Sequence, residues 1–405
     1  MSNRISLAVI VGLAGVFASG AVFAQDPCAG QKISKPLGKA MGAAEKAFNA
    51  KQWDEVIARV AEAEAVPDPK TDFDMYWMYE FRGRANINKQ DYEAALKDLE
   101  SSINSPCSPP ADKPARYKVL VQLAYQIKNY AKVIELGNKG LEAGGDPDMA
   151  AYVGNAYYAT DDFVNTRRVM SDVVSKQESQ GKTPEELTYR ILQGSCIKLK
   201  DTPCIIDMLE KLVAAYPKPD YWQDLIGLML AQTKNNNQLL NIWRLAEGND
   251  VLSDPAEYTE MAQLAIGQGL PGEAQSVLDR GFAKGVFAKS GKESATSVLN
   301  EAKNAAALDK STLDKQDVAA RAKPTGDNDV KLGAAYLSYG QNEKAVEALQ
   351  RGIGKGGVKN PDDAGLLLGI ALLRTGNKAE AAKAFASVKD PIYARVARLW
   401  TLRTT

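Results

Sequence analysis

The sequence predicts an all-α protein, a solenoid of about nine helical hairpins that ends in a capping helix. Three observations support this prediction. Two segments near the C-terminus repeat each other 36 residues apart, small residues recur with one fixed spacing along much of the chain, and prolines fall between the repeated segments. A single hairpin of this kind cannot bury its apolar face alone, so neighbouring hairpins are expected to stack into one continuous core.

Residues 1–24 have the pattern of a secretory signal peptide. One basic residue, Arg4, precedes an apolar run from Ile5 to Phe17, and small residues lead to Ala24. We expect cleavage after Ala24 and export to the periplasm, with no membrane span in the mature chain. An uncleaved anchor is the alternative, because about 20 apolar residues suffice to cross a bilayer.

The clearest repeat lies near the C-terminus, where Leu332–Tyr336 is matched 36 residues later by Leu368–Leu372. In both units a small first-helix residue precedes an Ala of the second helix by 12 positions, and the next inward residue follows 7 positions later. The triples with this spacing are Gly333, Ala345, Gly352; Gly369, Ala381, Val388; Gly83, Ala95, Ser102; and Ala262, Ala274, Gly281. Small residues let two antiparallel helices approach closely, so the triples predict where the helices of each hairpin meet.

Prolines mark the boundaries between hairpins, because a helix must stop before them. The predicted hairpins begin near Leu37, Tyr76, Pro114, Pro147, Glu186, Pro219, Pro255, Gly326 and Asp362. They define an N-terminal array over 25–288 and a C-terminal pair within 326–405. Residues 289–325 between them form either a charged helical insert or a degenerate repeat. We favour the degenerate repeat. Apolar residues at helical spacing predict a capping helix from Pro391 to Leu402.

Leu332, Gly333 and Tyr336, followed by a small residue at the start of the second helix, resemble the tetratricopeptide repeat, whose period is about 34 residues. The resemblance implies a superhelix with a concave wall made mainly of first helices. It also implies that outward-pointing first-helix residues contact a partner. The partner-binding residues expected on this basis are Arg84, Asn88, Lys118, Gln122, Gln126, Asn155 and Tyr158, with Tyr125 as a flanking anchor.

The equivalent positions near the C-terminus are apolar. They are Ala334, Leu337, Ile370 and Leu373. This face suits packing against the final helix or against a second copy of the chain, so homo-oligomerisation through the C-terminal repeats is one expectation.

The four cysteines are an even number, which suggests disulfides in an oxidising compartment. Cys196 lies late in a predicted first helix and Cys204 opens the second helix, so a hairpin would bring them together. We therefore favour a Cys196–Cys204 bond, with Cys28 and Cys107 as the remaining pair. Four cysteines allow three pairings, and the sequence alone does not choose between them.

The sequence offers little chemistry for catalysis. It contains no His, so the commonest general base and metal ligand is absent, and we expect no enzyme activity, no cofactor and no metal site. The acid pairs Asp161-Asp162 and Asp362-Asp363 fall in a turn and at a helix start, where Asp is expected for local hydrogen bonding. The 50 basic and 50 acidic residues balance, which argues against a nucleic-acid partner.

These observations favour a non-enzymatic periplasmic scaffold that binds a protein or an extended peptide. The layout of a signal peptide followed by repeats also resembles tetratricopeptide proteins associated with TonB–ExbB–ExbD energy-transduction systems. The alternative is a glycan- or cell-wall-binding protein that uses exposed aromatic residues. The aromatic pairs in question are Tyr76-Trp77, Tyr157-Tyr158 and Tyr221-Trp222.

Overall fold

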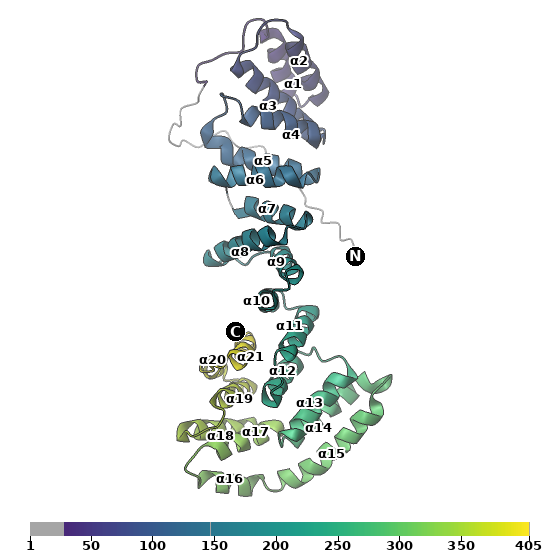
Figure 1. The fold of residues 1–405 in the computed structure, drawn as a ribbon, viewed down its shortest axis with the longest axis vertical. Coiled ribbons are helices and arrows are strands. Elements are labelled where there is room, and N and C mark those ends of the chain that lie inside the picture. The colour runs from purple at the N-terminus through teal and green to yellow at the C-terminus, as the bar shows by residue number, and fades with distance from the viewer. Residues whose placement is uncertain (1–27, 146, 405) are drawn as a thin grey trace. The chain divides into compact units, whose positions relative to one another are not determined.

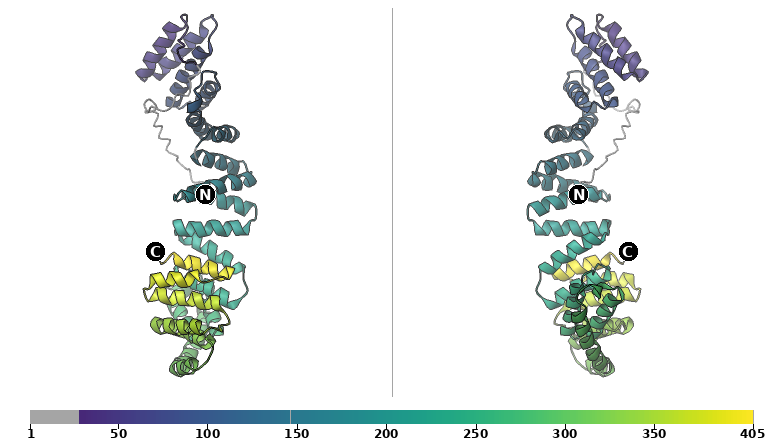
Figure 2. Two further views of the ribbon diagram at one scale, coloured as in Figure 1. Left: turned by 90° about the vertical axis from the view of Figure 1, so that its left-hand side faces the viewer. Right: turned by 90° about the vertical axis from the view of Figure 1, so that its right-hand side faces the viewer.

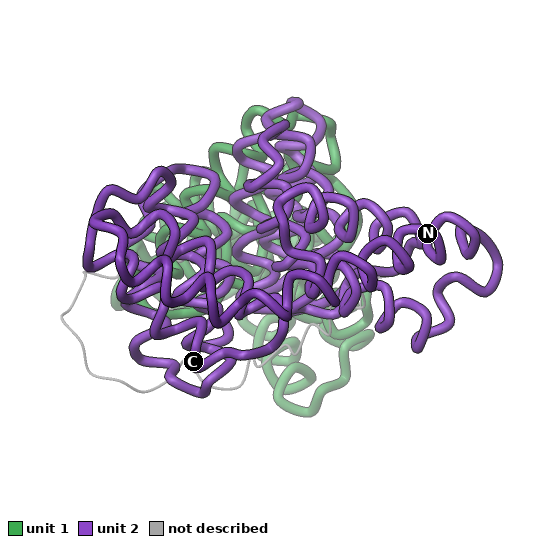
Figure 3. The backbone as a smooth tube through the Cα atoms, turned by 90° about the horizontal axis from the view of Figure 1, so that it is seen from below, with its two compact units in different colours: residues 1–184 green, residues 185–405 purple. Residues whose placement is uncertain are grey.

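The computed structural model describes residues 28–145 and 147–404, so the predicted signal peptide 1–24 lies outside the described residues. The described residues form 21 α-helices and no strand (Figure 1). The prediction of an all-α, tetratricopeptide-like solenoid is confirmed. The chain divides into two compact units, residues 1–184 and 185–405 (Figure 3). The predicted boundary after residue 288 and the one after residue 325 both fall inside the second unit.

Unit 1 consists of four hairpins. Its helices are α1 Gly38–Asn49, α2 Trp53–Ala65, α3 Asp72–Asn88, α4 Tyr92–Ile103, α5 Lys113–Gln126, α6 Tyr130–Glu142, α7 Pro147–Ala159 and α8 Phe163–Ser179. The second hairpin begins at Asp72 rather than near Tyr76, because Thr71 and Asp74 form a capping box that starts α3 one turn earlier. A short 3-10 helix, Pro110–Asp112, precedes α5.

Unit 2 contributes five further hairpins, and nine in total are described. Its helices are α9 Glu186–Lys198, α10 Thr202–Ala215, α11 Pro219–Ala231, α12 Asn236–Gly248, α13 Pro255–Gly267, α14 Pro271–Ala283, α15 Lys292–Lys310, α16 Leu313–Arg321, α17 Asp327–Ser338, α18 Asn342–Lys355, α19 Pro361–Arg374, α20 Lys378–Ala386 and α21 Pro391–Thr401. Helices α15 and α16 cover most of the segment 289–325. They do not pair with each other as the hairpins do, because α15 packs on α13 and α14 whereas α16 packs on α17.

Glycine sets the distance between the two helices of several hairpins. A Cβ atom added to Gly333 would lie 2.5 Å from Cγ of Leu349, and one added to Gly369 would lie 2.3 Å from the ring of Phe385. In both cases the large side chain comes 16 residues after the glycine. The close approach therefore comes from a glycine opposite a large side chain, whereas the sequence had suggested that small residues face one another.

The turn inside a hairpin has one conformation in most repeats. One residue adopts a positive φ, for example Lys128 at 59° and Gly340 at 70°. The following residue then donates its backbone N–H to a carbonyl five residues earlier, as Asn129 does to Ala124 at 2.9 Å. This bond satisfies a carbonyl that the end of the first helix would leave unpaired.

Unit 2 closes on itself. The last helix, α21, packs on α19 and α20 and also on α12, while α14 contacts α17 (Figures 1 and 2). Arg395 of α21 reinforces the closure, since its Nε donates to Oε1 of Glu210 in α10 at 2.7 Å. The predicted capping helix therefore covers the end of the last hairpin and also joins it to an earlier part of the same unit.

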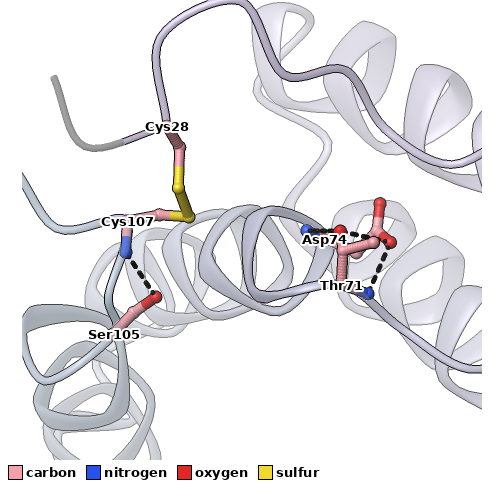
Figure 4. The surroundings of a disulfide bond; sticks show 5 residues. All are labelled: Cys28, Thr71, Asp74, Ser105 and Cys107. Carbon is pink, nitrogen blue, oxygen red and sulfur yellow. Dashed lines mark hydrogen bonds between the residues drawn. A yellow bond between two sulfur atoms is a disulfide. The ribbon is translucent and has the colours of Figure 1, made fainter.

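Two disulfides lie in the described residues. Cys28 is bonded to Cys107, with Cα atoms 5.2 Å apart, and Cys196 is bonded to Cys204, with Cα atoms 5.8 Å apart. This is the pairing that the hairpin argument favoured. The first bond ties the segment before α1 to the connection between α4 and α5 (Figure 4).

Candidate functional sites

A pocket of about 390 Å³ opens between α3 and α5 in unit 1. The long connection between α4 and α5 contributes Cys107 and Pro109 to its wall. Ser105 Oγ accepts the backbone N–H of Cys107 at 3.2 Å, and the disulfide holds the same residue from the other side (Figure 4). The connection is thus fixed at two points, and the pocket it borders is preformed.

The wall of this pocket is mainly apolar and aromatic. The side chains that supply this character are Phe73, Tyr76, Trp77, Ile87, Val119 and Leu120. Trp77 also lies edge-on to Phe73, with ring centroids 6.3 Å apart, and close to Phe81 at 5.6 Å. These ring contacts restrict its rotamer, so the pocket presents a fixed apolar surface.

One end of the pocket is polar. Glu80 is 2% exposed and accepts hydrogen bonds from Arg116 and Ser102. Arg84 pairs with the other oxygen of Glu80 at 2.7 Å, while its own side chain is 42% exposed. The guanidinium of Arg116 also lies over the ring of Tyr76, 5.3 Å from the centroid. Burial raises the pKa of Tyr76, and the charge of Glu80 adds to this shift. The buried carboxylate therefore faces two arginines, and the exposed carboxylate of Asp112 is the second acidic group of the lining.

The structure places the predicted partner-binding residues on α3, α5 and α7, but only Arg84 lines this pocket. Asn88 donates to the backbone carbonyl of Arg84 at 2.8 Å, and Lys118 lies 3.3 Å from a carboxylate oxygen of Asp148. Gln126 is exposed, whereas Gln122 and Asn155 are half-buried. These polar residues remain predicted contacts.

The predicted aromatic anchors contact other rings of the protein. Tyr125 lies edge-on to Tyr152 and Tyr130, with ring centroids 5.3 and 6.0 Å away, and burial raises its pKa. Tyr158 lies against Phe163 in the same way. Both rings therefore contribute to the packing of the hairpins, in addition to any surface that they present to a partner.

Arg116 and Glu80, which form the polar end, were not among the predicted residues. Glu80 and Arg84 are one helical turn apart, a spacing that brings opposite charges together on a helix. That spacing was a usable signal for their pairing. Arg116 lies 36 residues after Glu80, so only the stacking of two hairpins brings these residues together.

Unit 2 contains a larger cavity, of about 900 Å³, where its closure leaves space between α12, α14, α17, α19 and α21. One wall is apolar, with Leu337 and Ile370, which are 5% and 1% exposed. These belong to the late positions that the sequence assigned to the final helix or to a second subunit. The structure covers them with helices of the same chain.

A buried ion pair lies at the edge of this cavity. Arg244 donates to both carboxylate oxygens of Glu273, each at 2.7 Å, and to Oδ1 of Asn241 at 2.9 Å. Burial opposes both charges, but each partner stabilises the other. The pKa of Glu273 is consequently lowered and that of Arg244 is raised. Arg244 also lines a second cavity of about 630 Å³, together with Asp363, whose pKa is raised by burial.

The acid pairs singled out in the sequence have structural roles. Asp162 caps α8 by accepting the backbone N–H of Asn165, and Asp362 accepts that of Lys389. Among the described residues, no group of three or more Cys, Asp or Glu side chains is arranged to hold a metal ion. Within the same residues, no helix has the length and apolar character needed to cross a bilayer.

No family model and no curated protein matches the sequence. Among solved structures, the chain is similar to a tetratricopeptide repeat protein from Parabacteroides merdae, with 11% identity and a TM-score of 0.31 over 82% of this chain and 99% of that chain. It is also similar to the C-terminal part of a repeat-containing protein of the same kind from Cytophaga hutchinsonii, with 13% identity and a TM-score of 0.31 over 85% of this chain and 98% of that chain.

These TM-scores are low, so the assignment of the fold rests on the helices and turns described above. By that architecture the chain is a helical-repeat protein with tetratricopeptide-like hairpins.

Proposed function

We propose that this protein is a non-enzymatic scaffold that binds an extended peptide segment of a partner protein on the first helices of unit 1. The observation that carries the proposal is the preformed pocket between α3 and α5, with apolar walls and a polar end that includes the exposed guanidinium of Arg84. A pocket of this size accepts one large apolar side chain, the kind of anchor that dominates binding at protein interfaces. Scaffolds built from stacked helical repeats use such surfaces for binding.

The charges around the pocket indicate what should flank the anchor. Arg84 is at the rim and exposed, and Lys118 follows on the next first helix. The ion pair between Lys118 and Asp148 is solvent-accessible, and such pairs typically contribute only about 0–1 kcal/mol. Exchanging Asp148 for a ligand carboxylate therefore costs little. The preferred ligand is an apolar residue next to an acidic residue in an extended chain.

The compartment is part of the same proposal. Two disulfides favour an oxidising environment such as the periplasm, in agreement with the export signal expected at residues 1–24. Among periplasmic partners, the components of a TonB–ExbB–ExbD system are those that the layout of the sequence suggests.

Partner capture combined with matched variants tests the proposal. The purified protein is used to capture partners from periplasmic extract, and each partner is then measured against Val119→Glu. This change places a charge in the pocket wall and should weaken binding at least about tenfold, because it desolvates a carboxylate against apolar groups. The matched control is Val164→Glu, since Val164 is 63% exposed on α8 and outside the pocket.

Replacing Arg84, Lys118 and Asn155 together by Ala tests the predicted polar contacts on the first helices. The triple variant should bind the partner more weakly than the wild type does. The affinity of the wild type should also fall as salt is added, because exposed charges are screened. A partner that binds the wild type and the Val119→Glu variant equally well would place the site elsewhere.

The glycan-binding alternative receives no support from two of its three aromatic pairs. Trp222 is 6% exposed, and Tyr221 donates its hydroxyl hydrogen bond to Glu186. Tyr76 lies beneath Arg116. A flat exposed platform for sugar rings is therefore absent at these two pairs. Binding of peptidoglycan fragments in the capture assay would favour the glycan-binding alternative.

A further inference from the structure

The cavity of unit 2 has more positive than negative groups. Its lining contains four guanidinium groups, those of Arg244, Arg280, Arg374 and Arg403, and three carboxylates, those of Glu247, Glu273 and Asp279. The four arginines come from α12, α14, the end of α19 and the residues after α21. Segments more than 150 residues apart in the sequence therefore supply one charged lining, which exists only because the unit closes on itself.

Each carboxylate of this lining already has a cationic neighbour. Glu273 pairs with Arg244 and Glu247 pairs with Arg280, both at 2.7 Å. Asp279 lies 3.9 Å from the ammonium of Lys303, which comes from α15 and is not part of the lining. Each carboxylate of the lining is thus paired with a cation, whereas two arginines of the lining are not paired with a carboxylate.

Arg374 and Arg403 are those two, and neither has a carboxylate partner among the residues that the structure describes. Arg403 donates to the backbone carbonyl of Gly248 and lies over the ring of Trp400, 5.6 Å from its centroid. Arg374 makes no hydrogen bond or ion pair with any described residue. Arg374 lines the cavity and is exposed as a residue, and desolvation by the surrounding protein lowers its pKa, an effect that Glu273 and Glu247 partly oppose.

A guanidinium remains charged in any protein environment, and the five donors of Arg374 are available to the acceptors of a ligand. Carboxylates match the planar fork of the guanidinium and form two parallel hydrogen bonds with it. The lining has one net positive charge, which suits a ligand with one negative charge better than a multiply charged phosphate. The half-buried side chains of Ala334 and Leu373 supply an apolar surface for the rest of such a ligand.

We propose that the cavity of unit 2 binds an organic monocarboxylate with an apolar body, its carboxylate on Arg374 and its body against α17, α19 and Trp400. A volume of about 900 Å³ is within the range of sites for small organic ligands and short peptide ends. The carboxylate belongs either to a free small acid or to the C-terminal residue of a peptide. This site is separate from the pocket of unit 1, so its existence does not depend on the function proposed above.

Calorimetric titration of the purified protein with paired probes distinguishes these two sources. The first pair is 4-phenylbutyrate and its neutral amide, and the second is the peptide acetyl-Ala-Leu-Phe with a free or an amidated C-terminus. We expect one acid to bind, and its amide to bind at least about tenfold more weakly, since the amide lacks the charge-assisted hydrogen bonds that a carboxylate forms with a guanidinium. Binding of neither acid would overturn the proposal.

Arginine variants locate the carboxylate. Arg374→Gln should weaken binding of the acid at least about tenfold and leave binding of the amide unchanged, because only the charge-assisted contact is lost. Arg374→Lys should give an intermediate affinity, since it keeps the charge but loses the fork. The matched control is Arg190→Gln, because Arg190 is also exposed and in unit 2 but does not belong to the cavity lining. Equal affinity for the acid in wild type and Arg374→Gln would refute the assignment.

Two further measurements complete the test. A ligand in the cavity should change the fluorescence of Trp400, and Trp400→Phe should abolish that part of the signal. Sodium sulfate should compete only weakly, because it has no apolar body. Competition by sulfate as effective as that of the best acid would show a site for an inorganic anion and would contradict the proposal.

Discussion

Gly333 sets the separation of α17 and α18, since its missing side chain makes room for Leu349. A methyl group at this position would lie 2.5 Å from Cγ of Leu349 and 3.2 Å from the backbone nitrogen of the same residue. Leu349 is fully buried and has little space to move. We therefore expect Gly333→Ala to lower the free energy of unfolding by about 1–3 kcal/mol, the usual cost of overpacking. Urea denaturation followed by circular dichroism measures this change.

A matched glycine gives the opposite expectation. Gly227 lies in the middle of α11, and nothing lies within 4 Å of a Cβ atom added there. Gly227→Ala should stabilise the protein by up to about 1 kcal/mol, because alanine has the higher helix propensity. If both variants raise the urea midpoint, the steric interpretation of Gly333 is wrong.

Asp74 illustrates a pH-dependent contact at the scale of one residue. Burial acts to raise its pKa, but hydrogen bonds from the backbone N–H groups of Ser34 and Thr71, both at 2.9 Å, outweigh burial and lower it. The carboxylate therefore stabilises the folded state at pH values above its unfolded pKa, about 3.9, and this stability is lost as the pH falls below that value.

Asp74→Asn should thus be less stable than wild type by about 1–3 kcal/mol at pH 7, and the difference should shrink as the pH is lowered below about 4. Denaturation with urea at pH 7, 4 and 3 measures both effects. Asp68→Asn is the control at pH 7, since Asp68 is exposed in the loop before α3 and its substitution should change stability by less than about 0.5 kcal/mol. A constant difference across the pH range would contradict the role assigned to the carboxylate.

At the scale of elements, the two disulfides connect helices over very different lengths of chain. Cys196–Cys204 links the end of α9 to the start of α10 across 8 residues, whereas Cys28–Cys107 spans 79 residues and encloses two complete hairpins. Loop entropy predicts a stabilisation of about 2–3 kcal/mol for the short link and about 4–5 kcal/mol for the long one.

Replacing each cysteine pair by Ser should therefore cost more stability for Cys28 and Cys107 than for Cys196 and Cys204. Thermal denaturation of the two double variants under identical conditions measures the order. Peptide mapping without reduction must first show both bonds in the wild-type protein. A larger loss for the Cys196 and Cys204 variant would mean that strain or local packing, and not chain entropy, decides the effect.

At the scale of unit 2, closure depends on α21. Trp400 is 4% exposed and lies against Gly248 of α12, where an added Cβ atom would come within 2.4 Å of its ring. Trp400→Ala should cost about 3–5 kcal/mol, as expected for removing a buried Trp. Because α12 and α21 are far apart in sequence, hydrogen exchange should speed up in α12 as well as in α19 and α20.

Leu402→Ala is the matched control for this experiment, since Leu402 is 37% exposed just after the same helix. It should leave exchange in α12 unchanged. Faster exchange in α19 to α21 alone, with α12 unaffected, would show that the last hairpin frays without opening the unit, and would contradict the role of α21 in closure.

Local signals in the sequence determined the hairpins. Prolines at helix starts and a glycine 16 residues before a large residue act within one hairpin, so the starts at Pro147, Glu186, Pro219 and Pro255 coincide with the structure. The segment 289–325 is less regular because its two helices find partners in different neighbours. The capping box of Thr71 and Asp74 is also a local signal, and it explains why α3 begins one turn before the start that the repeat spacing predicts.

The tertiary structure decided where the candidate sites are. Arg84 was predicted to contact a partner, and its pairing with Glu80 follows from their spacing on one helix. The pocket beside it also depends on Arg116, which the stacking of the next hairpin supplies. The cavity of unit 2 depends on α21 returning to α12, and no repeat pattern encodes that contact. Helix starts, turns and spacing within a hairpin act over a few dozen residues, so the sequence by itself determined them. Contacts between residues far apart in the sequence depend on the sum of many small rotations between successive repeats. Only the folded structure determines that sum.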